Sequence, residues 1–150
     1  MSGWVRFTEQ FTSAPRLHDK IDGTNLVRGP VARWREALMV MQNRKCFYGD
    51  DHDMGRPEVD HVVPWSFVLE DKTWNLVIAC RKCNNEKRDR LTPAIAIERL
   101  CARNDEIANS NLNVGASFRR DFSEWHSRDL NSHIKGLYDQ AIADRFPVWS

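Results

Sequence analysis

The protein has 150 residues, which is the usual size of one domain and is enough to bury a hydrophobic core. Six tryptophans and seven phenylalanines supply large apolar side chains, and this excludes a wholly disordered chain. The formal net charge is only +1, from 22 basic and 21 acidic residues, which excludes a protein that coats nucleic acid through a large positive excess.

The first residues carry no basic segment followed by an apolar one, so no secretory signal is expected. No stretch approaches the roughly 18–20 consecutive apolar residues that span a bilayer. We therefore expect a cytoplasmic, reducing location. There, four cysteines are typical of metal ligands or buried thiols rather than disulfide partners.

The N-terminal segment, residues 1–44, is expected to be helical and to contribute packing rather than chemistry. Its first part offers only apolar anchors, at Trp4, Phe7 and Phe11. From Val31 to about Arg44 the apolar side chains recur at helical spacing, which predicts one amphipathic packing helix.

Residues 45–91 have a different character, with short β-rich runs separated by turn-forming residues. The runs are Cys46–Tyr48, Val59–Val63 and Leu76–Ala79, and the polar segment from Asn84 to Arg90 predicts a brief basic helix. Residues 92–150 read as C-terminal helices. The first starts at Thr92-Pro93, and the last carries an apolar stripe at Leu130, Ile134, Leu137, Tyr138, Ala141 and Ile142. The predicted fold is α+β, a mainly helical single domain of residues 1–150 around a small ββα centre.

Asp60 and His61 lie inside the apolar run that ends at Pro64. A carboxylate and an imidazole are costly to bury there unless they bond to a partner. Neighbouring strand residues point to opposite faces, so both can serve one site only if the strand bends near Pro64. By itself the pair is more typical of an edge strand than of a functional site.

Asn84 follows the Cys80-Arg81-Lys82-Cys83 segment at the expected start of a helix. Asparagine is a common helix cap, but its amide oxygen is also a hard ligand suited to Mg²⁺ or Mn²⁺. Lys87 lies three residues later and would share the helix face of Asn84. Residues 81–90 hold five basic and two acidic side chains, a pattern typical of a solvated face or of phosphate contacts.

Taken together, these residues resemble the HNH nuclease (ββα-metal) family from about Cys46 to Leu91. The resemblance rests on Cys46-Phe47-Tyr48, Val59-Asp60-His61-Val62-Val63-Pro64-Trp65-Ser66, Trp74-Asn75-Leu76-Val77 and Cys80-Arg81-Lys82-Cys83-Asn84-Asn85-Glu86-Lys87. The chain is similar, too, to the HNH module of RNA-guided CRISPR effector nucleases. Asn84 stands where many family members carry a final histidine, which makes this an HNN-type variant and favours a hard cation.

The resemblance implies a role for each matched residue. His61 would be the general base that takes a proton from the attacking water. Asp60 and Asn84 would hold one Mg²⁺ or Mn²⁺, and Asn75 would orient His61 through its side chain or its backbone. The products would carry 5′-phosphate and 3′-hydroxyl ends. The basic run at residues 81–90 supplies the candidates for nucleic-acid contacts, namely Arg81, Lys87 and Arg88.

Family members of this layout often bind a structural Zn²⁺ through two Cys-x-x-Cys pairs. Cys80 and Cys83 match one pair, and Cys46 begins the other, whose second position is Gly49 here. A tetrahedral site needs a fourth ligand, for which His52 is the first candidate. Cys101 and His18 are weaker candidates, and in the alternative the thiols simply pack without zinc.

Three functions remain open. The first is an endonuclease acting on nucleic acid, with double-stranded DNA as the expected partner. The second is a nucleic-acid-binding module with an inactive HNH-like scaffold, and the third is a subunit of a defence or mobile-element system that depends on a protein partner. Because the catalytic set is complete, the sequence favours the enzyme. It identifies no target sequence, since no base-reading module is recognisable.

Overall fold

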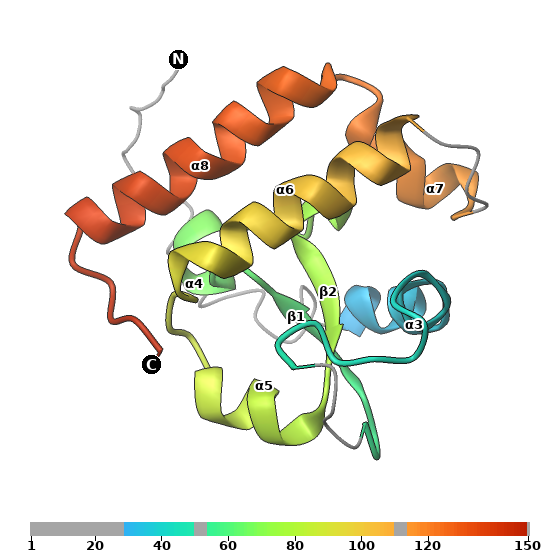
Figure 1. Ribbon diagram of the computed structural model, residues 1–150, viewed down its shortest axis with the longest axis horizontal. Coiled ribbons are helices and arrows are strands. Elements are labelled where there is room, and N and C mark those ends of the chain that lie inside the picture. Colours follow the sequence, from blue (N-terminus) through green and yellow to red (C-terminus); the bar gives the residue numbers. More distant parts are fainter. Residues whose placement is uncertain (1–28, 50–53, 110–113, 150) are drawn as a thin grey trace. The chain divides into compact units, whose positions relative to one another are not determined.

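The computed structural model describes residues 29–49, 54–109 and 114–149 (Figure 1). By its internal contacts the chain divides into Met1–Val31 and Ala32–Ser150, and the account below concerns the second unit. The apolar anchors expected near the N-terminus, Trp4, Phe7 and Phe11, lie outside the described residues, as do His18 and His52.

The helix predicted from Val31 to about Arg44 is shorter than expected. A 3₁₀ turn, η2 (Gly29–Trp34), leads into α3 (Arg35–Met41). The α-helix ends there because Asn43 and Arg44 adopt positive φ angles of 52° and 57°. Gln42 then pairs its side-chain amide with the backbone of Ile78, at 2.9 Å to the carbonyl and 2.8 Å from the N–H. This joins the end of α3 to the strand that contains Ile78.

A two-stranded antiparallel sheet forms the centre of the unit. β1 (Glu58–His61) pairs with β2 (Leu76–Ala79) so that Asp60 faces Val77 and His61 faces Leu76. Every residue of β2 is fully buried, as expected of a short uninterrupted apolar run. The connection contains α4 (Trp65–Val68) and the 3₁₀ turn η3 (Thr73–Asn75). The β-rich run predicted at Cys46–Tyr48 is instead a tight turn, closed by a bridge from Cys46 to Gly49.

The helix α5 (Arg81–Lys87) follows β2 and packs on β1, which completes the ββα centre. Cys80 is its N-cap, and its sulfur accepts the N–H of Cys83. Asn84 therefore lies within the helix rather than at its start, so helix capping does not explain this asparagine.

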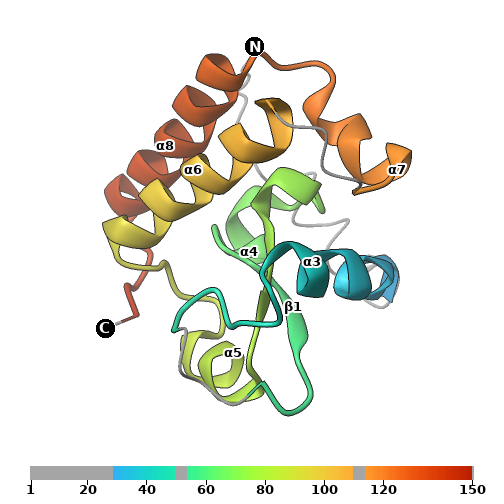
Figure 2. The same cartoon turned by 45° about the vertical axis from the view of Figure 1, so that its right-hand side comes forward.

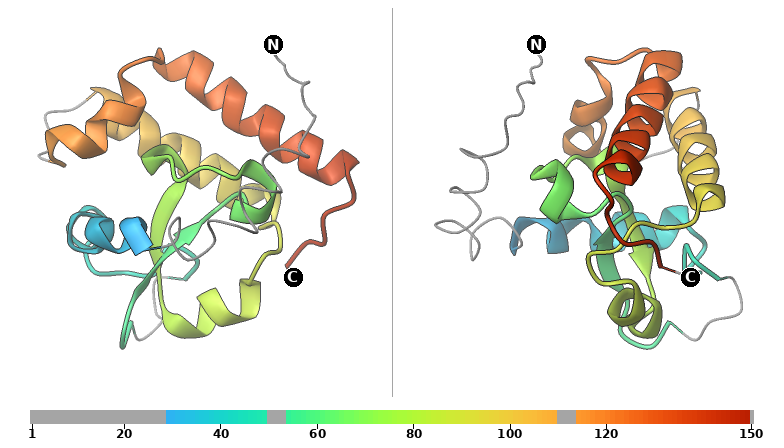
Figure 3. Two further views of the ribbon diagram at one scale, coloured as in Figure 1. Left: turned by 180° about the vertical axis from the view of Figure 1, so that it is seen from behind. Right: turned by 90° about the vertical axis from the view of Figure 1, so that its left-hand side faces the viewer.

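The C-terminal part consists of α6 (Ala94–Asn109), α7 (Ala116–Arg119) with the 3₁₀ turn η4 (Arg120–Phe122), and α8 (Ser127–Ala143). The long helices α6 and α8 lie side by side in every view (Figures 1 and 3). They run antiparallel, because contacts that advance along α8 step back toward the start of α6: Asn131 to Asp105, Lys135 to Glu98 and Tyr138 to Thr92. The α+β architecture expected from the sequence is confirmed.

These helices hold the segment that enters β2. Arg103 of α6 donates to the carbonyls of Leu76, Thr73 and Trp74, at 2.7, 3.3 and 3.3 Å. Thr73 in turn is bonded to Phe118 O and to the carboxylate of Asp121, both at 2.8 Å. In Figure 2, α5 lies near one end of the strand pair and α6 and α8 near the other. The contacts from α6, α7 and η4 therefore fix η3, the turn that carries Asn75.

The chain ends alongside α5. Leu91 accepts the N–H of Trp149 at 2.7 Å and donates its own N–H to Pro147 O at 2.8 Å, which forms a short parallel bridge. Among the described residues, no helix has both the length and the apolar character needed to cross a bilayer.

Candidate active site and thiol cluster

Asp60 is a buried carboxylate with two strong partners. Its Oδ2 accepts the hydroxyl proton of Tyr48 at 2.6 Å and lies 3.3 Å from the ammonium of Lys87. Burial, followed by the neighbouring Asp60 charge, raises the pKa of Tyr48 well above its ordinary value, so this hydroxyl stays protonated and donates. Both contacts reach the same oxygen, which leaves Oδ1 as the oxygen for a further ligand.

Lys87 is completely buried, and its ammonium also donates to the carbonyl of His61 at 2.8 Å. The sequence predicts a nucleic-acid contact for this residue, but a fully buried side chain cannot reach a phosphate backbone. Its position on the helix face of Asn84 instead turns it inward, where it neutralises Asp60 and fixes the end of β1. A buried charge requires such pairing.

The imidazole of His61 is buried at the end of β1 and meets a carboxylate that the sequence reasoning missed. Its Nε2 lies 2.8 Å from Oδ1 of Asp71, whose side chain is 25% exposed. Asp71 comes from the loop between α4 and η3. The side chains of Asp60 and His61 thus have different partners, which are Tyr48 and Lys87 for Asp60 and Asp71 for His61.

Asn75 holds the chain immediately after His61. Its side-chain amide both accepts the N–H of Val63 and donates to Val63 O, each at 2.9 Å, and its backbone carbonyl accepts the N–H of Val62 at 2.9 Å. The sequence assigns the orientation of His61 to Asn75, through its side chain or its backbone. In the structure these contacts act on the backbone, and it is Asp71 that touches the ring.

Asn84 is half-buried on α5 and faces β1. Its amide nitrogen donates to Oε1 of Glu58, which orients the amide and turns the oxygen away from that carboxylate. Glu58 precedes Asp60 by two residues, so the two carboxylates share one face of the strand. This spacing is the signal that would have identified Glu58. Glu58, Asp60 and Asn84 offer carboxylate and amide oxygens, the hard type of ligand that suits Mg²⁺ or Mn²⁺.

Cys46, Cys80 and Cys83 form a second group, which we call the thiol cluster. Their sulfur atoms lie within 4.8 Å of one another, and all three side chains are buried. Backbone N–H groups point at the sulfurs: Cys46 Sγ accepts from Tyr48 and Cys80, and Cys80 Sγ accepts from Cys83, all at 3.4 Å. Such donors favour thiolate, the form that binds metal.

Ionisation differs within the thiol cluster. Burial opposes the thiolate of Cys80, but the backbone and side-chain hydrogen bonds of Cys83 outweigh it and lower the pKa of Cys80. Burial, followed by the hydrogen bond to Cys80, raises the pKa of Cys83. Cys80 therefore ionises before Cys83, and a bound cation would be needed to ionise Cys83 at neutral pH.

The expected fourth zinc ligand, His52, lies outside the described residues. Within the part of the chain that the structure describes, the metal-binding group consists of the three thiols without a further His, Cys, Asp or Glu. Tyr48, Met54 and Trp149 pack around it instead. Cys101 does not belong to this group, and it is a buried thiol on α6 whose pKa is raised by burial.

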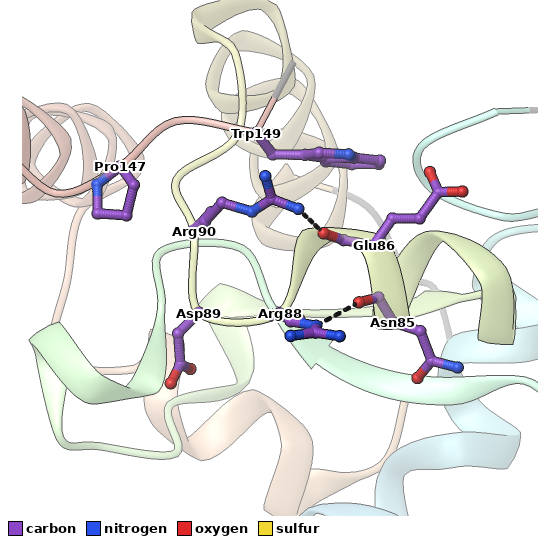
Figure 4. Close-up of a pocket in the computed structure, with 7 residues that line it drawn as sticks. All are labelled: Asn85, Glu86, Arg88, Asp89, Arg90, Pro147 and Trp149. Atoms are coloured by element: carbon purple, nitrogen blue, oxygen red, sulfur yellow. Dashed lines mark hydrogen bonds between the residues drawn. The ribbon is translucent and has the colours of Figure 1, made fainter.

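The outer surface of α5 is basic. Arg81 and Arg88 are exposed. Arg88 borders a surface hollow between the end of α5 and the C-terminal segment, together with Asn85, Glu86, Asp89, Arg90, Pro147 and Trp149 (Figure 4). Arg88 donates to Asn85 O at 3.2 Å, and Arg90 donates to Glu86 O. Guanidinium groups thus lie on the helix that carries Asn84, at Arg81, and just beyond its end, at Arg88 and Arg90.

Two sequence comparisons agree with this geometry. Residues 50–93 match the family described as HNH endonuclease. The chain is also similar to the CRISPR-associated endonuclease Cas9 of Listeria innocua, with 37% identity over 60 residues. That match covers 37% of this chain and only 4% of the relative. The family segment contains Glu58, Asp60, His61, Asp71, Asn75 and Asn84, whereas Cys46 lies before it.

Proposed function

We propose, because residues 50–93 match the family described as HNH endonuclease, that the protein is a metal-dependent endonuclease that hydrolyses nucleic-acid phosphodiester bonds, with DNA as the substrate. The observation that carries the proposal is the arrangement of polar groups on β1. A histidine paired with a carboxylate follows directly on an acidic residue whose second oxygen is available. Packing alone does not require such costly buried groups.

His61 is the proposed general base. When the Nε2–H group donates a hydrogen bond to Asp71, the ring is in the tautomer whose Nδ1 can take a proton from water. The same carboxylate then stabilises the imidazolium that forms. Asn75 supports this by fixing the backbone of residues 62 and 63, so the ring keeps its place while the proton moves.

Asp60 and Asn84 are the proposed ligands of the catalytic cation, Mg²⁺ or Mn²⁺, with Glu58 beside them. A cation bound there would offset the charge that develops on the phosphate and on the departing oxygen. Lys87 holds the Asp60 carboxylate in place before the cation binds, since it pairs with Oδ2. Arg81 and Arg88 are the proposed phosphate contacts, and the products carry 5′-phosphate and 3′-hydroxyl ends.

A structural Zn²⁺ is proposed for the thiol cluster. Three buried thiols that already receive backbone N–H donors fit this metal, and the position of Gly49 leaves the fourth ligand to another residue, with His52 as the candidate. Free thiols in the described part of the chain suit a reducing, cytoplasmic location.

The alternative is a subunit of a defence or mobile-element system that is inactive without a protein partner. One observation favours it: the similar endonuclease is far longer than this chain, which matches only 4% of its length. The two functions predict different behaviour for the isolated protein.

The test is cleavage of supercoiled plasmid DNA by the purified protein in Mg²⁺, in Mn²⁺ or in EDTA. We expect metal-dependent nicking that is lost in His61→Ala and kept in His126→Ala, which removes an exposed histidine outside the site. Nicking that survives in His61→Ala would contradict the general-base assignment. The absence of cleavage of both DNA and RNA under every condition would favour the partner-dependent alternative.

A further inference from the structure

We propose that Tyr48 is a positioning residue that connects the thiol cluster to the cation site, because its hydroxyl holds Asp60 while its backbone is held by Cys46. The inference rests on the proposed function, which assigns a cation to Asp60. It adds Tyr48 to the residues that shape the cation site, and it adds a coupling between that site and the thiol cluster.

The first step is the constraint on the carboxylate. A carboxylate can rotate about its Cβ–Cγ bond and present either oxygen. Here the Tyr48 hydroxyl at 2.6 Å and the Lys87 ammonium at 3.3 Å both engage Oδ2 of Asp60. Hydrogen bonds to an ionised acceptor are the stronger kind. The rotation is therefore stopped with Oδ1 available to the cation.

The second step is the constraint on Tyr48 itself. Its N–H donates to Cys46 Sγ at 3.4 Å, and the turn around it is closed by Gly49 N–H to Cys46 O at 3.3 Å. Its ring packs edge-on against Phe47 and Trp149, with ring centres 5.3 Å apart in both pairs. The hydroxyl therefore cannot leave Asp60 unless this turn moves.

The third step follows from the sulfur. A metal on the thiol cluster would bind Cys46 Sγ, the atom that already holds the Tyr48 backbone, and would stiffen the turn. A stiffer turn holds Asp60 more firmly. We therefore expect occupancy of the thiol cluster to strengthen Mn²⁺ binding at Asp60, by about fivefold or more.

The test compares Tyr48→Phe with Tyr138→Phe, which likewise loses one tyrosine hydroxyl but at a remote hydrogen bond to Thr92 O. Mn²⁺ binding is measured by electron paramagnetic resonance, and the thiol cluster by the thiolate absorption of added Co²⁺. We expect Mn²⁺ binding to be about tenfold weaker in Tyr48→Phe, as for loss of a hydrogen bond to a charged group, and unchanged in Tyr138→Phe. The Co²⁺ bands should be unchanged in both variants. Mn²⁺ binding within twofold of the unmodified protein would overturn the proposal.

A second measurement does not depend on the folding of any variant. The unmodified protein is titrated with Mn²⁺ after loading with one equivalent of Zn²⁺ or with none. Tighter Mn²⁺ binding in the loaded protein supports the coupling, and equal binding overturns it. Since neither titration uses nucleic acid, a Tyr48 effect without any cleavage would reject the proposed function alone. Cleavage that is identical in Tyr48→Phe and the unmodified protein, with equal Mn²⁺ binding, would reject the inference alone.

Discussion

The thiol cluster and the polar centre formed by Glu58, Asp60, His61, Asp71 and Asn84 share one short helix but are built in opposite ways. Cys80 and Cys83 lie at the start of α5, and Asn84 follows directly. The thiol cluster consists of identical groups, all buried. The polar centre pairs unlike groups and stays partly open at Asn84 and at Asp71, which is 25% exposed. The thiol cluster is thus enclosed in the core, whereas the polar centre includes side chains that a substrate could contact.

This contrast predicts where substitutions should act. Changes in the thiol cluster should reduce stability first, because its side chains belong to the core. Changes at the open positions of the polar centre should reduce activity first. Lys87 tests the boundary, since it contacts Asp60 and the backbone of His61 yet is as buried as any core residue.

The largest effect is expected for Lys87→Met. The substitution keeps much of the side-chain volume but removes the Lys87 ammonium that pairs with the buried Asp60 carboxylate. Breaking such a pair costs about 3–5 kcal/mol. Urea denaturation measures the loss. The matched control is Lys82→Met on the exposed face of the same helix, where a change within about 0.5 kcal/mol is expected. A Lys87→Met protein as stable as the control would place Lys87 in the open site rather than in the core.

The next effect concerns the thiol cluster. Cys83→Ser should abolish zinc binding at the thiol cluster. In the presence of zinc, the variant should be less stable than the unmodified protein by about 2–3 kcal/mol. Its unfolding midpoint should then no longer respond to a chelator, whereas that of the unmodified protein should fall when the chelator is added.

Cys101→Ser is the control for this experiment, because it also places a hydroxyl in a buried thiol position but lies outside the thiol cluster. It should lose stability and yet keep the full response to the chelator. If chelation leaves the unmodified protein unchanged, the three thiols pack without metal, and the contrast between the two sites becomes one of packing alone.

The elements of the ββα centre could be predicted because they depend on local patterns. The apolar run Leu76–Ala79 forms β2 with the predicted bounds. The helix predicted to start at Thr92-Pro93 is α6, which begins directly after Pro93. Asp60 and His61 could be proposed as site residues only through their spacing to Asn75 and Asn84, because the pair alone is more typical of an edge strand. By contrast, Cys46–Tyr48 looked like a strand by composition but is a turn. Cys46 accepts the N–H of Tyr48 at its sulfur and the N–H of Gly49 at its carbonyl, and the segment has no full partner strand.

The contacts between polar groups could not be predicted in the same way. Asp71 meets His61 only because α4 and η3 fold the intervening loop back over the strand end. Nothing in the local sequence of Asp71 distinguishes it from a solvated acidic residue. Lys87 was misread for the same reason, because a helical lysine is ordinarily exposed and its burial depends on the placement of Asp60 across the interface between α5 and β1.

The smallest effect, and the one most specific to the open site, is expected for Asp71→Asn. Asparagine keeps the size of the side chain, but it cannot stabilise an imidazolium, and its amide can donate to Nε2 and favour the wrong tautomer. We expect kcat for plasmid nicking to fall about 10- to 100-fold, equivalent to about 1.4–2.7 kcal/mol.

Folding stability should change by less than about 1 kcal/mol in Asp71→Asn, because the carboxylate is partly solvated. The control is Asp139→Asn on the exposed side of α8, which should change neither quantity. A structural role for Asp71 would reverse the pattern, with lower stability and an unchanged kcat. An unchanged kcat would also leave His61 without an orienting partner on its ring, and the Asn75 contacts to Val62 and Val63 would then have to position the base alone.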